Sequence, residues 1–71
     1  MIVVPTYRGF RIEVKAVEAD GRWDAEVRIR QHAVHAKPRV RIVNCCELTA
    51  EHAERAGEIW AKRWVDAKGG A

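Results

Sequence analysis

Hydrophobic and polar residues alternate along two neighbouring segments in the first half of the chain. In residues 7–17 apolar side chains take every second position and charged side chains lie between them, as Phe10, Ile12, Val14 and Ala16 against Arg11, Glu13 and Lys15. Residues 23–30 repeat the pattern, as Trp23, Ala25, Val27 and Ile29 against Asp24, Glu26, Arg28 and Arg30. A period of two is typical of strands that have one apolar and one charged face. We therefore predict strands at about residues 7–17 and 23–30.

The Asp20-Gly21 dipeptide predicts how these two strands pair. Asp-Gly between alternating segments favours a two-residue type I′ turn, because both central residues of that turn need positive φ. The resulting register pairs Ala16 with Ala25, Val14 with Val27 and Ile12 with Ile29 on the apolar face, and Lys15 with Glu26 and Glu13 with Arg28 on the charged face. Both faces are then complementary, whereas a slip by one residue would bury charges.

A shorter alternating segment follows a polar connection, and we predict a third strand at about residues 39–43. Its apolar residues are expected to face the core and its basic residues to face outward, as Val40 and Ile42 against Arg39 and Arg41. Pro38 at its start suits an edge strand, because proline cannot donate a ladder hydrogen bond. For the same reason Pro5 limits the apolar residues 2–4 to an irregular lead-in or a stub of strand.

The last third of the chain predicts one long helix at about residues 50–68. With about 100° per residue, one stripe collects small and aromatic residues, namely Ala53, Ala56, Gly57, Trp60, Trp64 and Ala67. Thr49 is the expected N-cap. Glycines at the end of the segment stop the helix, so residues 69–71 are expected to be frayed. Ile59 and Val65 flank the stripe.

These elements predict an α+β fold in a single domain over residues 1–71: a three-stranded antiparallel meander with one C-terminal helix packed on one face, β-β-β-α. The apolar stripe of the helix and the apolar face of the sheet each need a partner. The expected core is Phe10, Ile12, Val14, Trp23, Val27, Ile29, Val40, Ile42, Trp60 and Trp64. In a chain of 71 residues the burial of apolar surface barely exceeds the loss of conformational entropy, which makes a homodimer a reasonable expectation.

Charge is unevenly distributed along the chain. Residues 1–43 contain nine Lys and Arg against five Asp and Glu, which gives +4, whereas residues 44–71 contain four against five, which gives −1. The apolar start of the chain is too short for a signal peptide or a membrane span. Cys45 and Cys46 are adjacent, so they do not suggest a disulfide framework. We therefore expect a cytoplasmic protein with no membrane partner.

The outward face of the predicted sheet is the most distinctive surface. It gathers the basic residues Arg11, Lys15, Arg28, Arg30, Lys37, Arg39 and Arg41. Arg11 is expected to face Arg30, and like charges in direct opposition are unfavourable. Two interpretations follow: a phosphate-binding surface for nucleic acid, or a solvated face whose charges protect the sheet edges. No aromatic residue faces outward, so a base-stacking platform is not expected.

Histidines and cysteines provide the other candidates for chemistry. His32, His35, Cys45, Cys46 and His52 are of types that bind zinc, but adjacent cysteines place both sulfurs on one ion only with difficulty. Cys46 lies close to the predicted helix N-terminus, where a thiolate is favoured, and His52 is the only base expected nearby. Exposed loop histidines and cysteines packed beside the helix explain both sets more simply. We expect no metal, no cofactor and no catalytic residue, and hence no enzyme.

Several short motifs resemble those of a known group of proteins. They are Tyr7-x-Gly9-Phe10, Asp20-Gly21-x-Trp23, Thr49-x-x-x-Ala53 and Trp64-Val65-Asp66. Together they resemble short, uncharacterised β-β-β-α proteins of Gram-negative bacteria. The topology is also distantly similar to HicB-like antitoxin domains, which are partial double-stranded-RNA-binding folds. The chain departs from the HicB pattern because it lacks the proline-rich turn after the second strand. The resemblance implies a fold and names no chemistry.

Two functional hypotheses follow. The first is a small, non-enzymatic module for protein interaction or self-association, which uses a sheet edge or the helix residues Ile59 and Val65. The alternative is a nucleic-acid-binding module that uses the basic outer face of the sheet.

Overall fold

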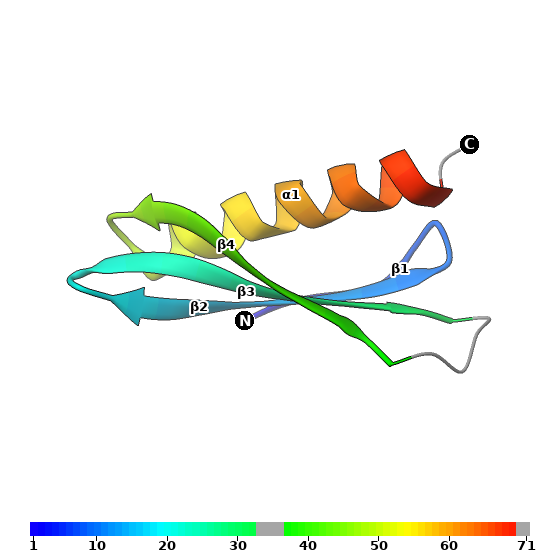
Figure 1. Cartoon of the computed structure of the whole chain (residues 1–71), viewed down its shortest axis with the longest axis horizontal. Coiled ribbons are helices and arrows are strands. Elements are labelled where there is room, and N and C mark those ends of the chain that lie inside the picture. The colour runs from blue at the N-terminus through cyan, green and yellow to red at the C-terminus, as the bar shows by residue number, and fades with distance from the viewer. Residues whose placement is uncertain (33–36, 70–71) are drawn as a thin grey trace.

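The computed structural model describes residues 1–32 and 37–69, and it shows an α+β fold with one more strand than the sequence predicts. Its elements are β1 (Ile2–Tyr7), β2 (Phe10–Ala19), β3 (Arg22–Gln31), β4 (Arg39–Glu47) and α1 (Ala50–Gly69). The strands form an antiparallel meander in the order β1-β2-β3-β4, and α1 lies across one face of it (Figure 1). The predicted fold class, an antiparallel meander covered by a C-terminal helix, is confirmed.

The prediction of three strands is wrong because the apolar start of the chain forms β1. Ile2 pairs with Val14 and Val4 pairs with Ile12, so β1 extends the apolar face of the sheet. Pro5 lies within a register shift of an edge strand, where a missing donor is tolerated. Arg8 and Gly9 make the turn into β2, both with positive φ. An arginine at positive φ is uncommon, which is why the sequence gives no strong signal for this turn.

The β2–β3 hairpin has the predicted register. Asp20 and Gly21 both adopt positive φ, at 51° and 77°, as a type I′ turn requires. Val14 lies opposite Val27, and the pairing continues without a shift along all of both strands. This hairpin provides most of the core, which consists of Phe10, Ile12, Val14, Ala25, Val27 and Ile29 from the sheet, with Ala53, Ala61 and Val65 from the helix.

The helix packs on the sheet mainly through a stripe of mostly small residues, and its tryptophans make only part of the contact. Ala53, Gly57, Ala61 and Val65 follow one another at intervals of four and are all buried. Trp60 and Trp64, expected at the centre of the packed stripe, are only partly buried and pack against the core from its margin. The prediction that Val65 flanks the packed stripe and is available to a partner is therefore wrong, because this side chain is buried, with 0% of its surface exposed.

The side chains of β4 point to the opposite faces from those predicted. Arg41 pairs with Val27 and Ile29 pairs with Arg39, and residues in direct opposition share one face of a sheet. Both arginines therefore lie on the helix side, and Val40 and Ile42 lie on the outer face, 42% and 54% exposed. Their predicted place in the core is wrong.

The C-terminal half of β4 determines which face each of its side chains takes. There Val43 and Cys45 pack against the core, and a register shift separates the pairs that β3 makes through Trp23 and Ala25. Cys46 adopts positive φ in the same region. Because side chains alternate along a strand, burying Val43 places every second residue before it on the helix side as well.

Polar contacts fix both ends of the helix. The backbone N–H of His52 donates to Oγ1 of Thr49 at 3.2 Å, so the predicted N-cap is confirmed. At the other end Asp66 accepts a hydrogen bond from the hydroxyl of Tyr7 at 3.0 Å and pairs with Arg8 at 3.1 Å. These contacts tie the β1–β2 turn to the last turns of α1. No helix in the described part of the chain is long and apolar enough to span a membrane.

Candidate functional site

The edge strand β4 combines a free backbone edge with two chemically different rows of side chains. It pairs only with β3 among the described strands, so its other edge presents unpaired backbone donors and acceptors. Residues 39–42 are all exposed. Val40 and Ile42 form an apolar row on the outer face, and Arg39 and Arg41 form a basic row on the helix side. We call this segment, residues 39–42, the β4 edge.

The basic row begins beside a tryptophan of the helix. The guanidinium of Arg39 lies 5.7 Å from the centre of the Trp64 ring. The ammonium of Lys68 lies 5.4 Å from the same ring, and Phe10 meets this ring edge-on with the ring centres 6.2 Å apart. Cation–π contacts of this kind hold a cation near an aromatic face. Trp64 therefore joins the core to the basic row, a role that the sequence pattern did not indicate.

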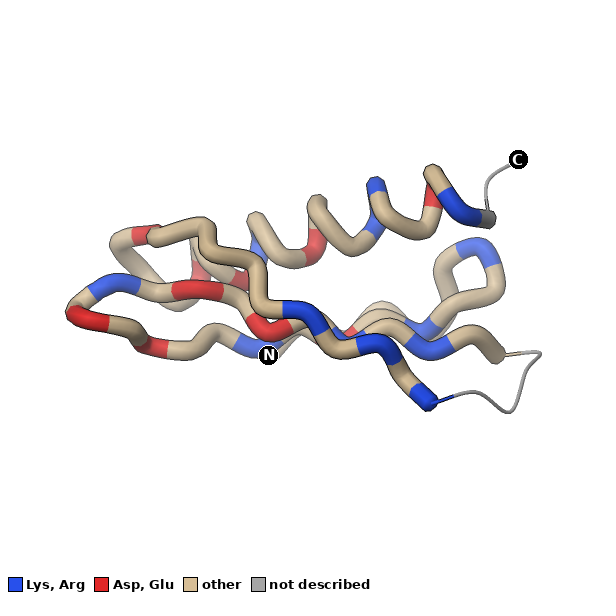
Figure 2. Tube along the Cα trace, viewed as in Figure 1, with Lys and Arg blue, Asp and Glu red and all other residues tan. Residues whose placement is uncertain are grey.

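The seven basic residues predicted for one surface do not share a face. Arg11, Lys15, Arg28 and Arg30 alternate with core residues along β2 and β3 and lie on the outer face, while Lys37 is exposed just before β4. Arg39 and Arg41 lie on the other side of the sheet. Figure 2 shows that basic positions gather where β4 begins, whereas acidic positions gather near the β2–β3 turn. The expected single basic face is therefore divided into two smaller groups.

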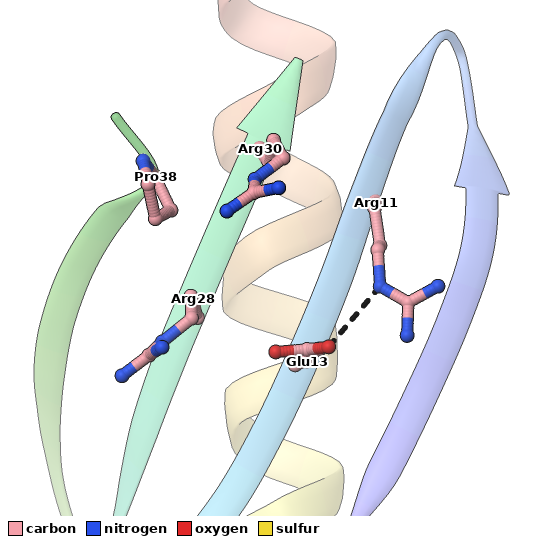
Figure 3. Close-up of a pocket in the computed structure, with 5 residues that line it drawn as sticks. All are labelled: Arg11, Glu13, Arg28, Arg30 and Pro38. Atoms are coloured by element: carbon pink, nitrogen blue, oxygen red, sulfur yellow. Dashed lines mark hydrogen bonds and ion pairs between the residues drawn. The ribbon is translucent and has the colours of Figure 1, made fainter. Parts of the chain in front are cut away.

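Carboxylates neutralise part of the outer group. Arg11 pairs with Glu13 at 3.1 Å, and Arg28 lies 3.9 Å from Glu26. The predicted opposition of Arg11 and Arg30 is confirmed by the register. A hollow of about 130 Å³ on the outer face is lined by Arg11, Glu13, Arg28, Arg30 and Pro38 (Figure 3).

The helix flank is reduced to a single residue. Ile59 is 48% exposed, as expected for a residue off the packed stripe. Val65, the other residue predicted to flank the stripe, is buried in the core. One exposed aliphatic side chain is ordinary on a protein surface, so the flank offers no interaction surface comparable to the β4 edge.

The cysteines and histidines take separate places in the fold. Cys45 is partly buried, its Sγ donates to the carbonyl oxygen of Trp23 at 3.6 Å, and burial raises the pKa of its thiol. The exposed Cys46 donates its backbone N–H to Asp24 at 3.0 Å. His35 lies outside the described residues.

His32 has a structural contact of its own. One of its ring nitrogens, Nε2, lies 2.8 Å from the carbonyl oxygen of Pro5, so the N–H tautomer at this position ties the end of β3 to β1. Within the described ranges no three His, Cys, Asp or Glu side chains lie close enough to hold a metal ion.

Comparisons of the chain with protein-family models, with curated proteins and with solved structures find no match.

Proposed function

We propose that this protein is a cytoplasmic, non-enzymatic interaction module that binds an extended acidic segment of a partner protein along the β4 edge. The observation that carries this proposal is the two-sided character of an exposed edge strand, apolar on the outer face and basic on the helix side. An extended peptide adds to such an edge through main-chain hydrogen bonds, and its alternate side chains determine specificity.

The side chains of the β4 edge define the sequence of the partner. A partner residue that pairs with Val40 or Ile42 lies on the outer face, where an apolar side chain strengthens binding. A partner residue that pairs with Arg39 or Arg41 lies on the helix side, where an acidic side chain strengthens binding. Each complementary cross-strand pair contributes roughly 0.2–1 kcal/mol. The expected partner strand therefore alternates aliphatic residues with Asp or Glu.

Charge favours a different protein over a second copy as the occupant. The exposed part of β4 contains Arg39 and Arg41 and no carboxylate, and Lys37 precedes it. Two copies paired through this segment would place arginines near one another on one face, where like charges oppose pairing. The nearest acidic residue of the strand is Glu47, beyond the register shift. Self-association through β4 is therefore the weaker alternative.

A peptide titration tests the proposal. Binding of a labelled peptide with alternating Val and Glu is measured by fluorescence anisotropy, beside a peptide of the same composition in scrambled order. Arg41→Glu is expected to weaken binding at least about tenfold, since it replaces an attractive pair with a repulsive one. A Val–Lys peptide should then bind Arg41→Glu better than it binds the unaltered chain.

Arg55→Glu is the matched control, because Arg55 is exposed on the helix and this variant makes the same change of charge away from β4. Equal effects of Arg41→Glu and Arg55→Glu would overturn the proposal, because they would indicate attraction by net charge alone. Sedimentation of the free protein at two concentrations tests whether a second copy of the chain binds the β4 edge. A dimer that Arg41→Glu strengthens would show that a second copy occupies the edge instead.

A further inference from the structure

The outer face carries a second candidate site that is independent of the β4 edge. Its hollow of about 130 Å³ is lined by Arg11, Glu13, Arg28, Arg30 and Pro38. A single water needs only about 10–15 Å³ of such space, so the hollow has room for a larger group. Three guanidinium groups and one carboxylate give it a formal charge of +2.

The arrangement of the arginines leaves one of them without a partner. Arg11 and Arg30 are directly opposite each other, and Figure 3 shows Arg11 turned away from Arg30 toward Glu13, to which it is bonded. Arg30 has no ion pair within the described residues, and Pro38, just before β4, is the other residue that lines the hollow beside it. Arg28 is two residues along the same face and directly opposite Glu13. Glu13 is paired with Arg11, and Glu26 lies 3.9 Å from the Arg28 guanidinium.

We propose that Arg28 and Arg30 form a binding site for the dianionic phosphate group of a phosphate monoester, with Arg11 as a third ligand. Guanidinium groups bind phosphate through paired N–H donors. A monoester carries about −1.5 to −2 charges at pH 7, which matches the charge of the hollow. The bound anion also relieves the opposition between Arg11 and Arg30 by lying between two like charges.

A single phosphate group fits this surface better than a nucleic-acid strand does. A strand needs a continuous row of free cations and gains from aromatic stacking. On this face Asp24 and Glu26 precede Arg28 along β3, so the positive charge ends within a few residues. Of the other basic residues predicted to extend the row, Arg39 and Arg41 lie on the opposite side of the sheet, and Lys15 lies directly opposite Glu26.

Titration followed by amide and arginine side-chain NMR tests the site. The probes are inorganic phosphate, phosphoserine and a nucleoside monophosphate, beside a single-stranded DNA oligonucleotide, each at two salt concentrations. The phosphate probes are expected to shift the signals of Arg28 and Arg30 at one shared site. Binding of phosphoserine and of the nucleoside monophosphate should weaken below about pH 6, where a monoester loses its second charge. Comparison of the three distinguishes a free phosphate from a phosphorylated side chain or nucleotide.

Three variants decide the outcome. Arg30→Gln should weaken phosphate binding about tenfold or more, as loss of a charge-assisted hydrogen bond implies. Glu13→Gln should strengthen it, because this change frees Arg11. Arg22→Gln, at the other end of the same strand, should have little effect.

Equal weakening by Arg30→Gln and Arg22→Gln would overturn the proposal. So would DNA binding with no response to any monoester. A thermal melt of Arg30→Gln separates binding from folding, since removing one of two opposed arginines is expected to leave stability unchanged or slightly higher.

Discussion

Gly57 marks the closest approach of the helix to the sheet, and it allows a sharp test of the packing. A methyl group on this residue would lie 2.7 Å from Cβ of Ala25, 2.7 Å from Cγ1 of Val14 and 3.3 Å from Cγ2 of Val27. Carbon atoms in ordinary contact are about 3.5–4.0 Å apart. Gly57→Ala therefore requires the helix to lift from β2 and β3 by about 1 Å, or the strands to yield by a similar distance.

Two opposing effects determine the result. Alanine is more favourable than glycine in the middle of a helix by about 0.8–1.0 kcal/mol. Overpacking a close-packed core is unfavourable by about 1–3 kcal/mol. The clashing atoms belong to two different strands, so the helix cannot relieve both contacts by shifting sideways, and lifting it also weakens the contacts of Ala53 and Ala61. We therefore take the upper part of that range and expect a net loss of about 1–2 kcal/mol.

Urea unfolding measures this loss, followed by tryptophan fluorescence and by circular dichroism to establish a two-state transition. Val14→Ala supplies the matched control, because it removes the Cγ1 atom that the new methyl would meet. In the double variant the methyl on residue 57 fills part of the space that Val14→Ala leaves. The double variant should be more stable than the sum of the single effects predicts by about 1 kcal/mol. If Gly57→Ala were more stable than the unaltered chain, the gain in helix propensity would exceed the cost of overpacking. The close approach of the helix to β2 and β3 would then be refuted.

Three further predictions concern individual side chains. Tyr7→Phe removes the hydroxyl that donates to Asp66, and urea unfolding should show a loss of about 0.5–1 kcal/mol; no loss would mean that this bond contributes nothing at the helix end. Cys46 should react with iodoacetamide before Cys45, as followed by mass spectrometry, because burial raises the pKa of the Cys45 thiol. The Cys45 thiol of the folded chain then stays protonated at a pH where that of the unfolded chain ionises. Its contribution to the free energy of unfolding is therefore fully present below the ordinary thiol pKa and is lost as the pH rises through the raised pKa of the folded state. Cys45→Ser should remove that alkaline loss, and an unchanged pH profile would contradict the reasoning.

The elements defined by local signals could be predicted from the sequence. Asp20-Gly21 determines the turn, and the alternation on both sides of it leaves one register in which neither face buries a charge. The helix N-cap at Thr49 follows from a short-range preference in the same way. Each of these features depends on residues within a few positions of one another, which is why the prediction of the hairpin and of the helix N-cap succeeded.

Most of the predictions that failed concern features that depend on contacts between distant parts of the chain. The large size of Trp60 and Trp64 favoured a stripe centred on them, but close packing of a helix on a sheet selects the small residues around Gly57. The Arg8-Gly9 turn needs an arginine at positive φ, which local preference disfavours. For the basic residues, the sequence assigned those of β2 and β3 to the correct face of the sheet. It assigned Arg39 and Arg41 to the wrong face, because both phases of β4 alternate equally well.

The phase of β4 also separates the two functional hypotheses, and one pair of variants tests it. Val43 faces the core beside Ala25, so Val43→Asp places a carboxylate under the helix and should reduce stability by about 2–4 kcal/mol. Val40 lies on the outer face opposite Arg28, so Val40→Asp makes the same chemical change there and should alter stability by no more than about 0.5 kcal/mol. Urea unfolding of both variants gives the comparison directly.

The opposite order of losses would mean that Val40 is inward and that Arg39 and Arg41 face outward. The outer face would then hold a longer row of cations, which favours a nucleic-acid strand. The observed phase instead leaves a basic row and an apolar row on either side of one free edge. A peptide strand can use both rows of such an edge at once, whereas a nucleic-acid backbone would meet only one of them, and for this reason the phase of β4 favours a protein partner.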